Sequence, residues 1–249
     1  MPIYKKTRLD RLLVETGLAP SRAQAADLVR RGAVSMAGVP ALKPGALVAP
    51  GAVLEVEPGA SPYVSRGGLK LAAALEAFGL EPAGRVALDI GASTGGFTDM
   101  LLARGAAKVY AVDVGRGQLH ERLRADPRVV GLEATDARTL DARIVNERVS
   151  AIVADVSFIS LTLVLPAALR LAAEGAWLVV LVKPQFEAGR AAVGKGGIVR
   201  EAAEREKAVE RVRTFIEGEG GWTILGEIIS PILGGSGNEE FLIGARYGA

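Results

Sequence analysis

The sequence predicts an α/β protein built on a Rossmann-like, seven-stranded sheet whose last strand is antiparallel, with a small α/β domain in front of it. Three observations predict this fold. From residue 85 onwards, short β-branched runs alternate with helical stretches, a pattern typical of a parallel sheet covered on both faces. A glycine-rich turn follows the first of these runs, and the first 70 residues differ from the rest in charge.

Five apolar runs are expected to form parallel strands: RVALDIG, KVYAVDV, VVGLEAT, VSAIVADV and WLVVLVK. Helices are expected over residues 95–105, 116–125, 138–146, 159–174 and 200–219. The last two runs, GWTILGEII and EEFLIGARY, are joined by a loop with no room for a helix. We therefore expect them to form an antiparallel pair at the end of the sheet.

The small domain is expected over residues 1–60, followed by a linker over 61–64 and by the large domain over 65–249. Its helical stretches are TRLDRLLVETG and SRAQAADLVRRG, and its strand-like pieces are AVSMAG and AVLEVEP. Residues 1–70 carry ten Lys and Arg against five Asp and Glu, whereas the rest carries twenty against twenty-three. A basic segment on a nearly neutral body favours a polyanion such as nucleic acid as the partner.

The composition excludes several kinds of site. The chain has no cysteine, which rules out disulfides, cysteine-ligated zinc and thiol nucleophiles. Its single histidine, His120, is interpreted as a surface helix residue, and we expect no metal. No apolar run reaches the roughly 18 residues of a membrane span, and the N-terminus lacks the apolar core of a signal peptide. We therefore expect a cytoplasmic protein with no membrane partner.

The stretch ALDIGASTGGFT, residues 87–98, lies where an open α/β sheet binds a nucleotide-like ligand. It is neither a GxGxxG fingerprint nor a Walker loop. Its spacing places Asp89 at the end of the strand and Gly91, Gly95 and Gly96 in a tight turn. A carboxylate there disfavours a pyrophosphate and suits a cation. The pattern therefore favours S-adenosylmethionine, which carries a sulfonium and an ammonium and no phosphate.

Further acids follow the next strands at the same edge of the sheet. Asp113 ends the second strand, where a carboxylate can accept both ribose hydroxyls, and Asp136 follows the third, within reach of an adenine amino group. Asp155 ends the fourth strand. Each acid alone is more often a turn residue or a helix cap, but four at successive strand ends favour a cofactor site.

Two lysines and two carboxylates are expected to meet at this edge. Lys183 follows the fifth strand beside Asp155, Lys70 opens a helical stretch at the same end, and Glu240 starts the last strand. A ribose 2′-hydroxyl must lose a proton as it attacks a methyl group, and a lysine accepts that proton only in its neutral form. We expect Lys183 to be the base, Lys70 a second cation, and the two carboxylates to orient them.

Residues 8–56 resemble the ribosomal-protein-S4-type RNA-binding domain, with Arg-Leu-Asp, Ser-Arg, Arg-Gly and Lys-Pro in its order. The resemblance implies contacts to phosphates and duplex shape rather than base readout. The residues expected on the RNA face are Arg8, Arg11, Arg22, Arg30, Arg31 and Lys43.

The large domain resembles the FtsJ-like 2′-O-methyltransferases of RNA, and nearly the whole chain resembles the TlyA family, some of whose members carry a haemolysin name. The matching stretches are YVSRGGLKL, LDIGASTGGFTDMLL, DVGRGQL, VADVSFISL, LVKPQFE, VGKGGIV and SGNEEFL. The resemblance implies methylation of a cytidine 2′-hydroxyl in ribosomal RNA. It carries a Lys-Asp-Lys-Glu tetrad over to Lys70, Asp155, Lys183 and Glu240; Glu240 is preferred to Glu239 because it directly precedes an aromatic residue and Leu.

The resemblance also sets the expected partners. Ribosomal RNA or ribosomal subunits are expected to bind, with the protein a monomer or weak dimer, and the short stretch after the last strand favours the large subunit. The expected cofactor contacts are Asp89, Gly91, Ser93, Gly95, Gly96, Phe97, Asp113, Asp136 and Asp155. Arg66, Arg190 and Lys195 join the expected RNA contacts.

Other functions fit the sequence less well. A haemolysin or cytolysin would need a membrane-active segment, and a non-catalytic ribosome-assembly factor would not need the tetrad. A dinucleotide-dependent dehydrogenase would need the missing GxGxxG. Two features stay open: Phe158 either stacks a flipped base or packs in the core, and residues 186–199 form either a lid over RNA or a mobile loop.

Overall fold

The computed structural model describes residues 6–16, 18–19, 22–30, 32–41, 43–49, 51–57, 63–65, 67–189, 192–234 and 237–248. The chain divides into two compact units, Met1–Arg66 and Gly67–Ala249, each with a core of its own.

The smaller unit packs two helices on short strands. Its elements are β1 (Thr7–Arg8), α1 (Leu9–Glu15), α2 (Arg22–Arg30), β2 (Val34–Met36), β3 (Val39–Pro40), β4 (Leu47–Val48) and β5 (Leu54–Val56). The strands form an antiparallel β3-β2-β5 sheet and a β1-β4 pair. Leu13 and Leu28, one from each helix, are fully buried and pack with Val34. Two helices on a small sheet are what the sequence predicts for this unit.

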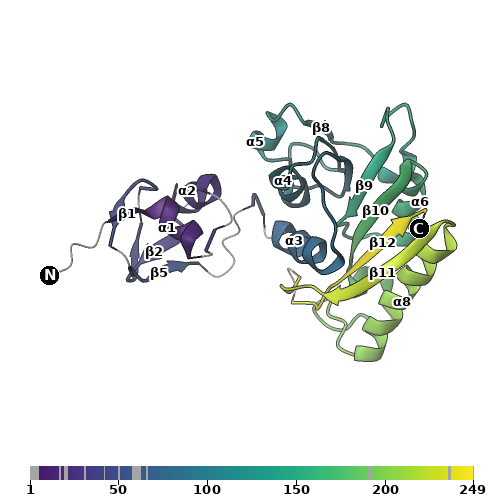
Figure 1. Cartoon of the computed structure of the whole chain (residues 1–249). Coiled ribbons are helices and arrows are strands. Elements are labelled where there is room, and N and C mark those ends of the chain that lie inside the picture. Colours follow the sequence, from purple (N-terminus) through teal and green to yellow (C-terminus); the bar gives the residue numbers. More distant parts are fainter. Residues whose placement is uncertain are drawn as a thin grey trace. The chain divides into compact units, whose positions relative to one another are not determined.

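The larger unit is built on a seven-stranded sheet (Figure 1). Its strands are β6 (Val86–Ile90), β7 (Lys108–Val112), β8 (Val129–Leu132), β9 (Val149–Ala154), β10 (Ala172–Val182), β11 (Trp222–Ile229) and β12 (Phe241–Tyr247). They lie in the order β11-β12-β10-β9-β6-β7-β8, and only β12 runs antiparallel to its neighbours. The predicted sheet and its antiparallel last strand are confirmed.

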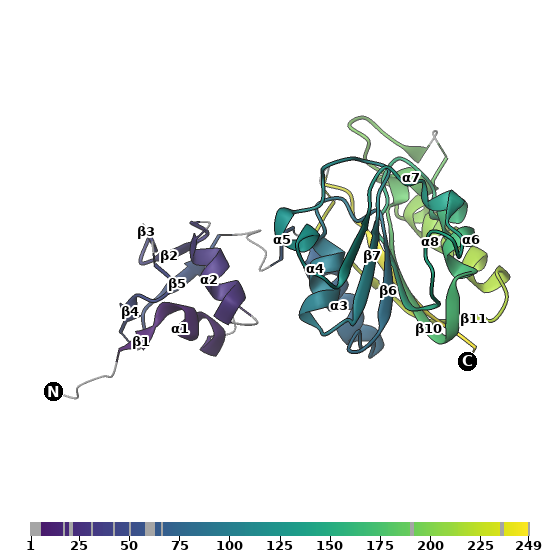
Figure 2. The ribbon, with the colours of Figure 1, turned by 90° about the horizontal axis from the view of Figure 1, so that it is seen from above.

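Helices cover both faces of this sheet (Figure 2). They are α3 (Gly67–Phe78), α4 (Gly96–Ala103), α5 (Glu121–Arg124), α6 (Leu161–Leu169), α7 (Pro184–Glu187) and α8 (Ala202–Gly218), with a 3₁₀ turn, η1, at Ala137–Thr139. The helices α3 and α4 lie on one face, and α6 and α8 lie on the other. In the part of the chain that the structure describes, no helix has the length and apolar character needed to cross a membrane.

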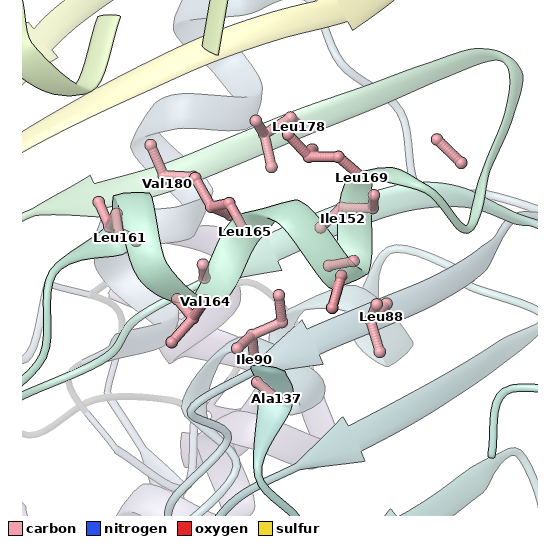
Figure 3. Close-up of a cluster of buried hydrophobic side chains, with 14 of the residues drawn as sticks. Leu88, Ile90, Ala137, Ile152, Leu161, Val164, Leu165, Leu169, Leu178 and Val180 are labelled. Atoms are coloured by element: carbon pink, nitrogen blue, oxygen red, sulfur yellow. The ribbon is translucent and has the colours of Figure 1, made fainter. Parts of the chain in front are cut away.

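Burial on both faces explains why the central strands read as continuous apolar runs. On the α6 face, Leu161 and Leu165 pack towards Val180, while Leu169 packs near Ile152 and Leu178 (Figure 3). All of these strand residues are fully buried. A polar residue in the middle of these strands would lose its water on either face, and the polar residues therefore gather where the strands end.

Three predicted helices are wrong in extent. The helix expected over 116–125 forms only as α5, Glu121–Arg124. The helix expected over 138–146 is only η1, because the carboxylates of Asp136 and Asp141 accept the backbone N–H groups of Arg138 and Arg143, both at 2.9 Å. These local turns compete with the helical ladder. The stretch expected over 159–174 forms α6 only as far as Leu169, and the chain then turns into β10.

The position of α3 is set by its last residue. The ring of Phe78 lies against Gly244 of β12, where an added Cβ would stand 2.5 Å from its Cδ2 atom, and against Gly226 of β11. Glycine at these two places lets the helix lie close to the sheet. Lys70, eight residues earlier on the same helix, is thereby held at the edge where the parallel strands end.

Candidate active site

The strand register brings three members of the predicted tetrad to one edge of the sheet. Ile90 of β6 pairs with Ala154 of β9, and the N–H of Asp155 then donates to the carbonyl of Ile90 at 2.9 Å. Val182 of β10 pairs with Phe241 of β12. Lys183 and Glu240, the next residues outward on these two strands, therefore emerge side by side.

The tetrad consists of two ion pairs. The Nζ atom of Lys183 lies 2.6 Å from Oδ1 of Asp155 and donates to Oγ of Ser157 at 2.9 Å. The Nζ atom of Lys70 donates to Oε2 of Glu240 at 2.5 Å. Lys70 and Glu240 are 8% and 3% exposed, so this pair is shut off from water, whereas Asp155 lies in the wall of a cavity.

A cavity of about 460 Å³ opens beside the first pair, at the ends of β6, β7 and β9. Several predicted cofactor residues line it: Gly91, Ser93, Asp113, Asp136 and Asp155. Other wall residues include Val112, Gln118, Thr135, Arg138, Val156 and Phe158. A cavity of this size with an apolar body and a few convergent polar groups is typical of a small-molecule site.

Asp113 is held in place by backbone donors. Its Oδ2 atom accepts the N–H of Ser93 at 2.8 Å, and its Oδ1 atom accepts the N–H of Gly115 at 2.7 Å. Ser93 donates from a left-handed backbone with φ of 49°, which is uncommon for a residue other than glycine. Such strain clusters at functional sites, and here it orients the carboxylate at the cavity wall.

Gly91 meets a hard steric limit. Its φ is 79°, and an added Cβ would lie 2.5 Å from the carbonyl oxygen of Asp155. The glycine lets the chain turn out of β6 while passing against the end of β9. The same close approach leaves the cavity open between the two strand ends.

Asp89 lies below the cavity rather than in its wall. It is fully buried and accepts a hydrogen bond from Oγ1 of Thr98 at 2.6 Å through Oδ2. Among the described residues none donates to its Oδ1 atom, which is itself buried. Burial is the main cause that raises the pKa of this carboxyl from 3.8 to about 7; the charges of Asp155 and Asp113 contribute to the rise, and the hydrogen bond from Thr98 opposes it.

The second half of the glycine-rich turn packs against other helices. Gly95, Gly96 and Phe97 begin α4 and do not line the cavity. A Cβ on Gly95 would stand 2.2 Å from Cδ1 of Leu123 on α5, and Phe97 is buried. Close packing thus accounts for these residues, and their contact with a cofactor stays a prediction.

Asp136 combines a cap with a place in the cavity wall. Its carboxylate accepts the N–H of Arg138 and forms an ion pair with the guanidinium of the same residue at 2.6 Å. This arginine holds the pKa of Asp136 below its usual range. Arg138 would therefore compete with a ligand for the Asp136 carboxylate. The sequence pattern did not indicate this competition.

Two carboxylates, the buried Glu187 and the partly exposed Glu133, hold the loops of the site and were missed in the sequence. Glu187 of α7 accepts Oγ of Ser160 at 2.5 Å and the N–H of Leu161 at 2.7 Å, joining the segment after Lys183 to the start of α6. Glu133 accepts the N–H of Gln118 at 2.6 Å. Both act on backbone groups of another segment, and such pairings leave no local signal in a sequence.

Phe158 does not belong to the core. It is 91% exposed, has a left-handed backbone with φ of 65°, and lies with its ring 5.1 Å from the ring of Phe186. Because it also lines the cavity, an aromatic face stands at the mouth of the site. The interpretation as a core residue is wrong.

In the smaller unit, one buried carboxylate pairs with two of the arginines that are predicted to contact RNA, Arg8 and Arg22. Asp10, only 4% exposed, accepts Nε of Arg8 at 3.0 Å and lies 3.3 Å from Nη2 of Arg22. The Arg8 hydrogen bond lowers the pKa of Asp10 to about 2. Arg11 instead pairs with Glu15 along α1.

The other predicted RNA contacts are not joined in this way. Arg30, Lys43 and Lys195 are exposed. Arg31, Arg66 and Arg190 lie outside the described residues.

A mostly parallel sheet with an acidic cavity at the ends of its first strands defines a Rossmann-like methyltransferase. The chain belongs to the FtsJ-like methyltransferase family, whose model matches residues 63–247, and an S4 domain model matches residues 7–54.

Relatives align over most of the chain. The 16S/23S rRNA (cytidine-2'-O)-methyltransferase TlyA of Mycobacterium tuberculosis is 49% identical, over 97% of this chain and 90% of the relative. The 23S rRNA (cytidine-2'-O)-methyltransferase TlyA of Campylobacter jejuni is 39% identical, over 72% and 69%. A solved Streptococcus thermophilus structure with a hemolysin name is 44% identical, covers 98% of this chain and 89% of that one, and has a TM-score of 0.74.

The raised pKa of Asp89 predicts a pH dependence of stability. The unfolded chain ionises this carboxyl near pH 3.8, whereas the folded unit keeps it protonated until about pH 7. Over that window the folded state binds more protons, so stability falls as pH rises and then levels off. The test compares the wild type with Asp89→Asn, which cannot ionise at this position. The free energy of unfolding of the wild type minus that of the variant should fall by up to about 1.4 kcal/mol per pH unit across this window.

Urea unfolding followed by tryptophan fluorescence measures this difference, because both tryptophans, Trp177 and Trp222, lie in the larger unit. Asp141→Asn is the control, since Arg143 lowers the pKa of Asp141 and its effect lies below this window. A wild-type-minus-variant difference that stays constant from pH 4 to 7 would contradict the assignment.

Proposed function

We propose that the protein transfers a methyl group from S-adenosylmethionine to the 2′-hydroxyl of a cytidine in ribosomal RNA. The observation that carries this proposal is the two Lys–carboxylate pairs at one edge of the sheet, of which Lys183–Asp155 borders an acidic cavity. It is supported by membership of the FtsJ-like methyltransferase family and by the activity in the names of the two TlyA relatives. The cavity and the tetrad favour this chemistry over a haemolysin.

The cavity residues fit S-adenosylmethionine. Asp113 and Asp155 place negative charge in the wall of the cavity, which suits a cation and repels a pyrophosphate. The backbone N–H groups on Asp113 leave lone pairs of both its oxygens for ribose hydroxyls, and Asp136 would hold the adenine end once Arg138 gives way. When bound, this cofactor supplies an electrophilic methyl carbon on its sulfonium.

Lys183 is proposed as the general base. Its Nζ atom is fixed between the Asp155 carboxylate and the Ser157 hydroxyl, which aims it along the wall of the cavity. In its neutral form the amine takes the proton of the ribose 2′-hydroxyl as the oxygen attacks. Fixing the base and the nucleophile in line with the methyl carbon supplies much of the rate.

Lys70 is proposed as the second cation. Its ammonium is delivered by a rigid helix and held by Glu240, with both groups nearly buried. A fixed charge in a water-poor place interacts strongly with the alkoxide that develops on the substrate. Because that alkoxide exists only near the transition state, we expect Lys70 to affect turnover more than cofactor affinity.

Large-subunit RNA is proposed as the substrate. The 23S molecule is the target common to the names of both TlyA relatives, and 16S RNA appears in one of them. Action on ribosomal RNA also places the protein in the cytoplasm. The mapping experiment below tests both RNAs.

The test of this function is a map of 2′-O-methyl groups on ribosomal RNA from cells that lack the protein. We expect a cytidine methyl group to disappear from 23S RNA and to return with the wild-type gene. It should not return with Lys183→Met, nor with the charge-free double variant Lys70→Met/Glu240→Gln, whose single-turnover rate should fall about a hundred- to thousandfold. Unchanged methylation in the deleted strain would refute the function.

Phe158 is proposed to stack the target base. An aromatic ring that is 91% exposed beside the cavity, braced by Phe186, presents a π-face to solvent. Enzymes that act on one nucleotide expose it and stack its base on such rings. Tertiary contacts do not otherwise account for a large apolar side chain in this position.

Replacing this ring should weaken catalysis without weakening the fold. Stacking on an aromatic side chain contributes about 1–3 kcal/mol, so Phe158→Leu should lower kcat/KM for ribosomal RNA roughly five- to a hundredfold, and Phe158→Tyr should retain it. Leu163→Ala, which removes another exposed apolar side chain, 58% exposed and on α6, is the control. Steady-state kinetics and the melting temperature are the measurements, and equal kcat/KM for Phe158→Leu and wild type would refute the role.

The S4 unit is proposed to supply affinity for RNA. Its support is the Arg8–Asp10–Arg22 cluster, in which a buried carboxylate holds two exposed guanidinium groups together. Two fixed guanidinium groups match the phosphates of one RNA backbone.

Arg8→Ala and Arg22→Ala should each weaken ribosomal RNA binding and reduce the slope of log affinity against log salt by about one. Arg143→Ala, a paired arginine of the larger unit with 91% side-chain exposure, should leave the slope unchanged. Filter binding across a salt series measures these slopes, and slopes that match wild type in both variants would remove the S4 cluster from the RNA interface.

A further inference from the structure

Three consecutive residues before β12 each hold a different part of the molecule. Glu240 binds Lys70 of α3, and Glu239 lies 3.0 Å from Nε of Arg205 on α8. Asn238, the first of the three, binds the segment between α7 and α8. The Glu240 carboxylate is therefore only two residues from Asn238, whose contacts are not part of the tetrad.

Asn238 closes a turn with both ends of its amide. Its Nδ2 atom donates to the carbonyl of Gly197 at 2.8 Å, and its Oδ1 atom accepts the N–H of Val199 at 3.0 Å. The side chain is 1% exposed, so these bonds are not shared with water. The asparagine amide offers an N–H donor and a carbonyl acceptor on two separate atoms, so it can bind both groups of the turn at once.

The clamped segment, which we call the 194–199 turn, is a regular structure. The N–H of Gly194 donates to the carbonyl of Ile198 at 3.0 Å, and the N–H of Gly197 donates to the carbonyl of Gly194 at 3.1 Å. Gly196 and Gly197 have φ of 81° and 76°, which only glycine adopts easily. Lys195 stands exposed at the tip.

Arg205 adds a second tie to the same turn. Its Nη1 atom donates to the carbonyl of Val199 at 3.4 Å and to that of the next residue, Arg200, at 2.7 Å, and its Nε atom faces Glu239. Two side chains, those of Asn238 and Arg205, therefore connect residues 238–240 to the 194–199 turn. These contacts hold the 194–199 turn in place, and the choice between a lid and a mobile loop for residues 186–199 as a whole stays open.

The Glu240 carboxylate is sensitive to this packing. Gly234 lies so close that an added Cβ would stand 2.3 Å from Oε1 of Glu240, and the N–H of Gly234 donates to the carbonyl of Asn238 at 2.9 Å. The N–H of Ser230 donates to the carbonyl of Glu240 at 2.8 Å. A shift of Asn238 would reach the carboxylate through this short, tightly packed loop.

We propose that Asn238 is a positioning residue that couples the grip of the 194–199 turn on RNA to the placement of Glu240 and, through it, of Lys70. The proposal rests on the methyl transfer proposed above. Lys195 binds a phosphate of the RNA near the target nucleotide, and Asn238 transmits the position of the turn to the ion pair. RNA bound out of register would leave the pair misplaced and turnover low.

The test is a double-mutant cycle between Lys195→Ala and Asn238→Ala, read by single-turnover methylation of ribosomal RNA and by filter binding. Asn238→Ala should lower the single-turnover rate at saturating RNA roughly tenfold or more, because a displacement of about 1 Å in the supporting structure of a site can cost about a hundredfold in rate. Calorimetric affinity for S-adenosylmethionine should change less than about twofold. Lys195→Ala should weaken RNA binding in wild type and have little further effect in the Asn238→Ala background.

Two further variants keep the proposal falsifiable. Asn238→Asp retains the acceptor for Val199 but loses the donor to Gly197, and its rate should lie between wild type and Asn238→Ala. Asn146→Ala, which removes the other asparagine of the chain from its contact with Tyr110, is the control and should leave the single-turnover rate unchanged.

The outcomes separate the coupling from the function. Additive effects of Lys195→Ala and Asn238→Ala, or a normal single-turnover rate in Asn238→Ala, overturn the coupling while the wild-type activity stands. If Asn238→Ala fails to fold, the Asn238→Asp cycle with Lys195→Ala decides in its place by the same criteria. A wild-type protein that methylates no ribosomal RNA refutes the proposed function and, with it, the coupling that rests on it.

Discussion

The Lys70–Glu240 ion pair is the contact on which the functional edge of the sheet depends. It joins the first helix of the larger unit to the start of its last strand, 170 residues later in the chain. Because both side chains are nearly buried, removing one partner leaves the other without water or counter-charge, which typically costs 3–5 kcal/mol. The pair therefore requires α3 to lie close to β12, and the glycines facing Phe78 allow that approach.

Negative charge at the same edge is balanced in a different way at each carboxylate. Asp155 has an ion pair with Lys183, and Asp113 has two backbone N–H donors. Asp89 has one hydroxyl donor, and its pKa rises towards neutrality. Because the negative charge of the carboxylates is only partly neutralised, they can lie together at this edge while the cavity still attracts a cation. The left-handed backbone at Ser93 is part of this balance, since it aims an N–H group at Asp113.

A second set of polar residues keeps the loops of the site in place without facing the cavity. Glu187 and Glu133 accept backbone N–H groups from neighbouring segments, and Asn238 holds a turn through both a donor and an acceptor. Loops that carry reacting groups need such support because a displacement of about 1 Å can cost much of the rate. Hydrogen bonds to backbone groups give this support without requiring a particular side chain in the neighbouring segment.

The sequence by itself determined the sheet and the kinds of residue at its edge. A strand buried on both faces has to be apolar along its length, so polar residues such as Asp113, Asp155 and Lys183 mark where strands end, and strand ends of a parallel sheet share one edge. Each of these patterns lies within one segment of the chain, so it can be recognised without knowing which segments pack together in the fold. The strand-end pattern pointed to Lys70, Asp155, Lys183 and Glu240, and the family resemblance carried a tetrad over to the same four positions.

Only the tertiary structure decided which of these residues meet. The pairing of Lys70 with Glu240, the competition of Arg138 for Asp136 and the burial of Asp89 depend on elements brought together from distant parts of the chain. The exposure of Phe158 was likewise undecidable, because an apolar residue after a strand fits a core as well as a binding surface. Partner choice and solvent access follow from how whole elements pack, and spacing along one segment does not contain that information.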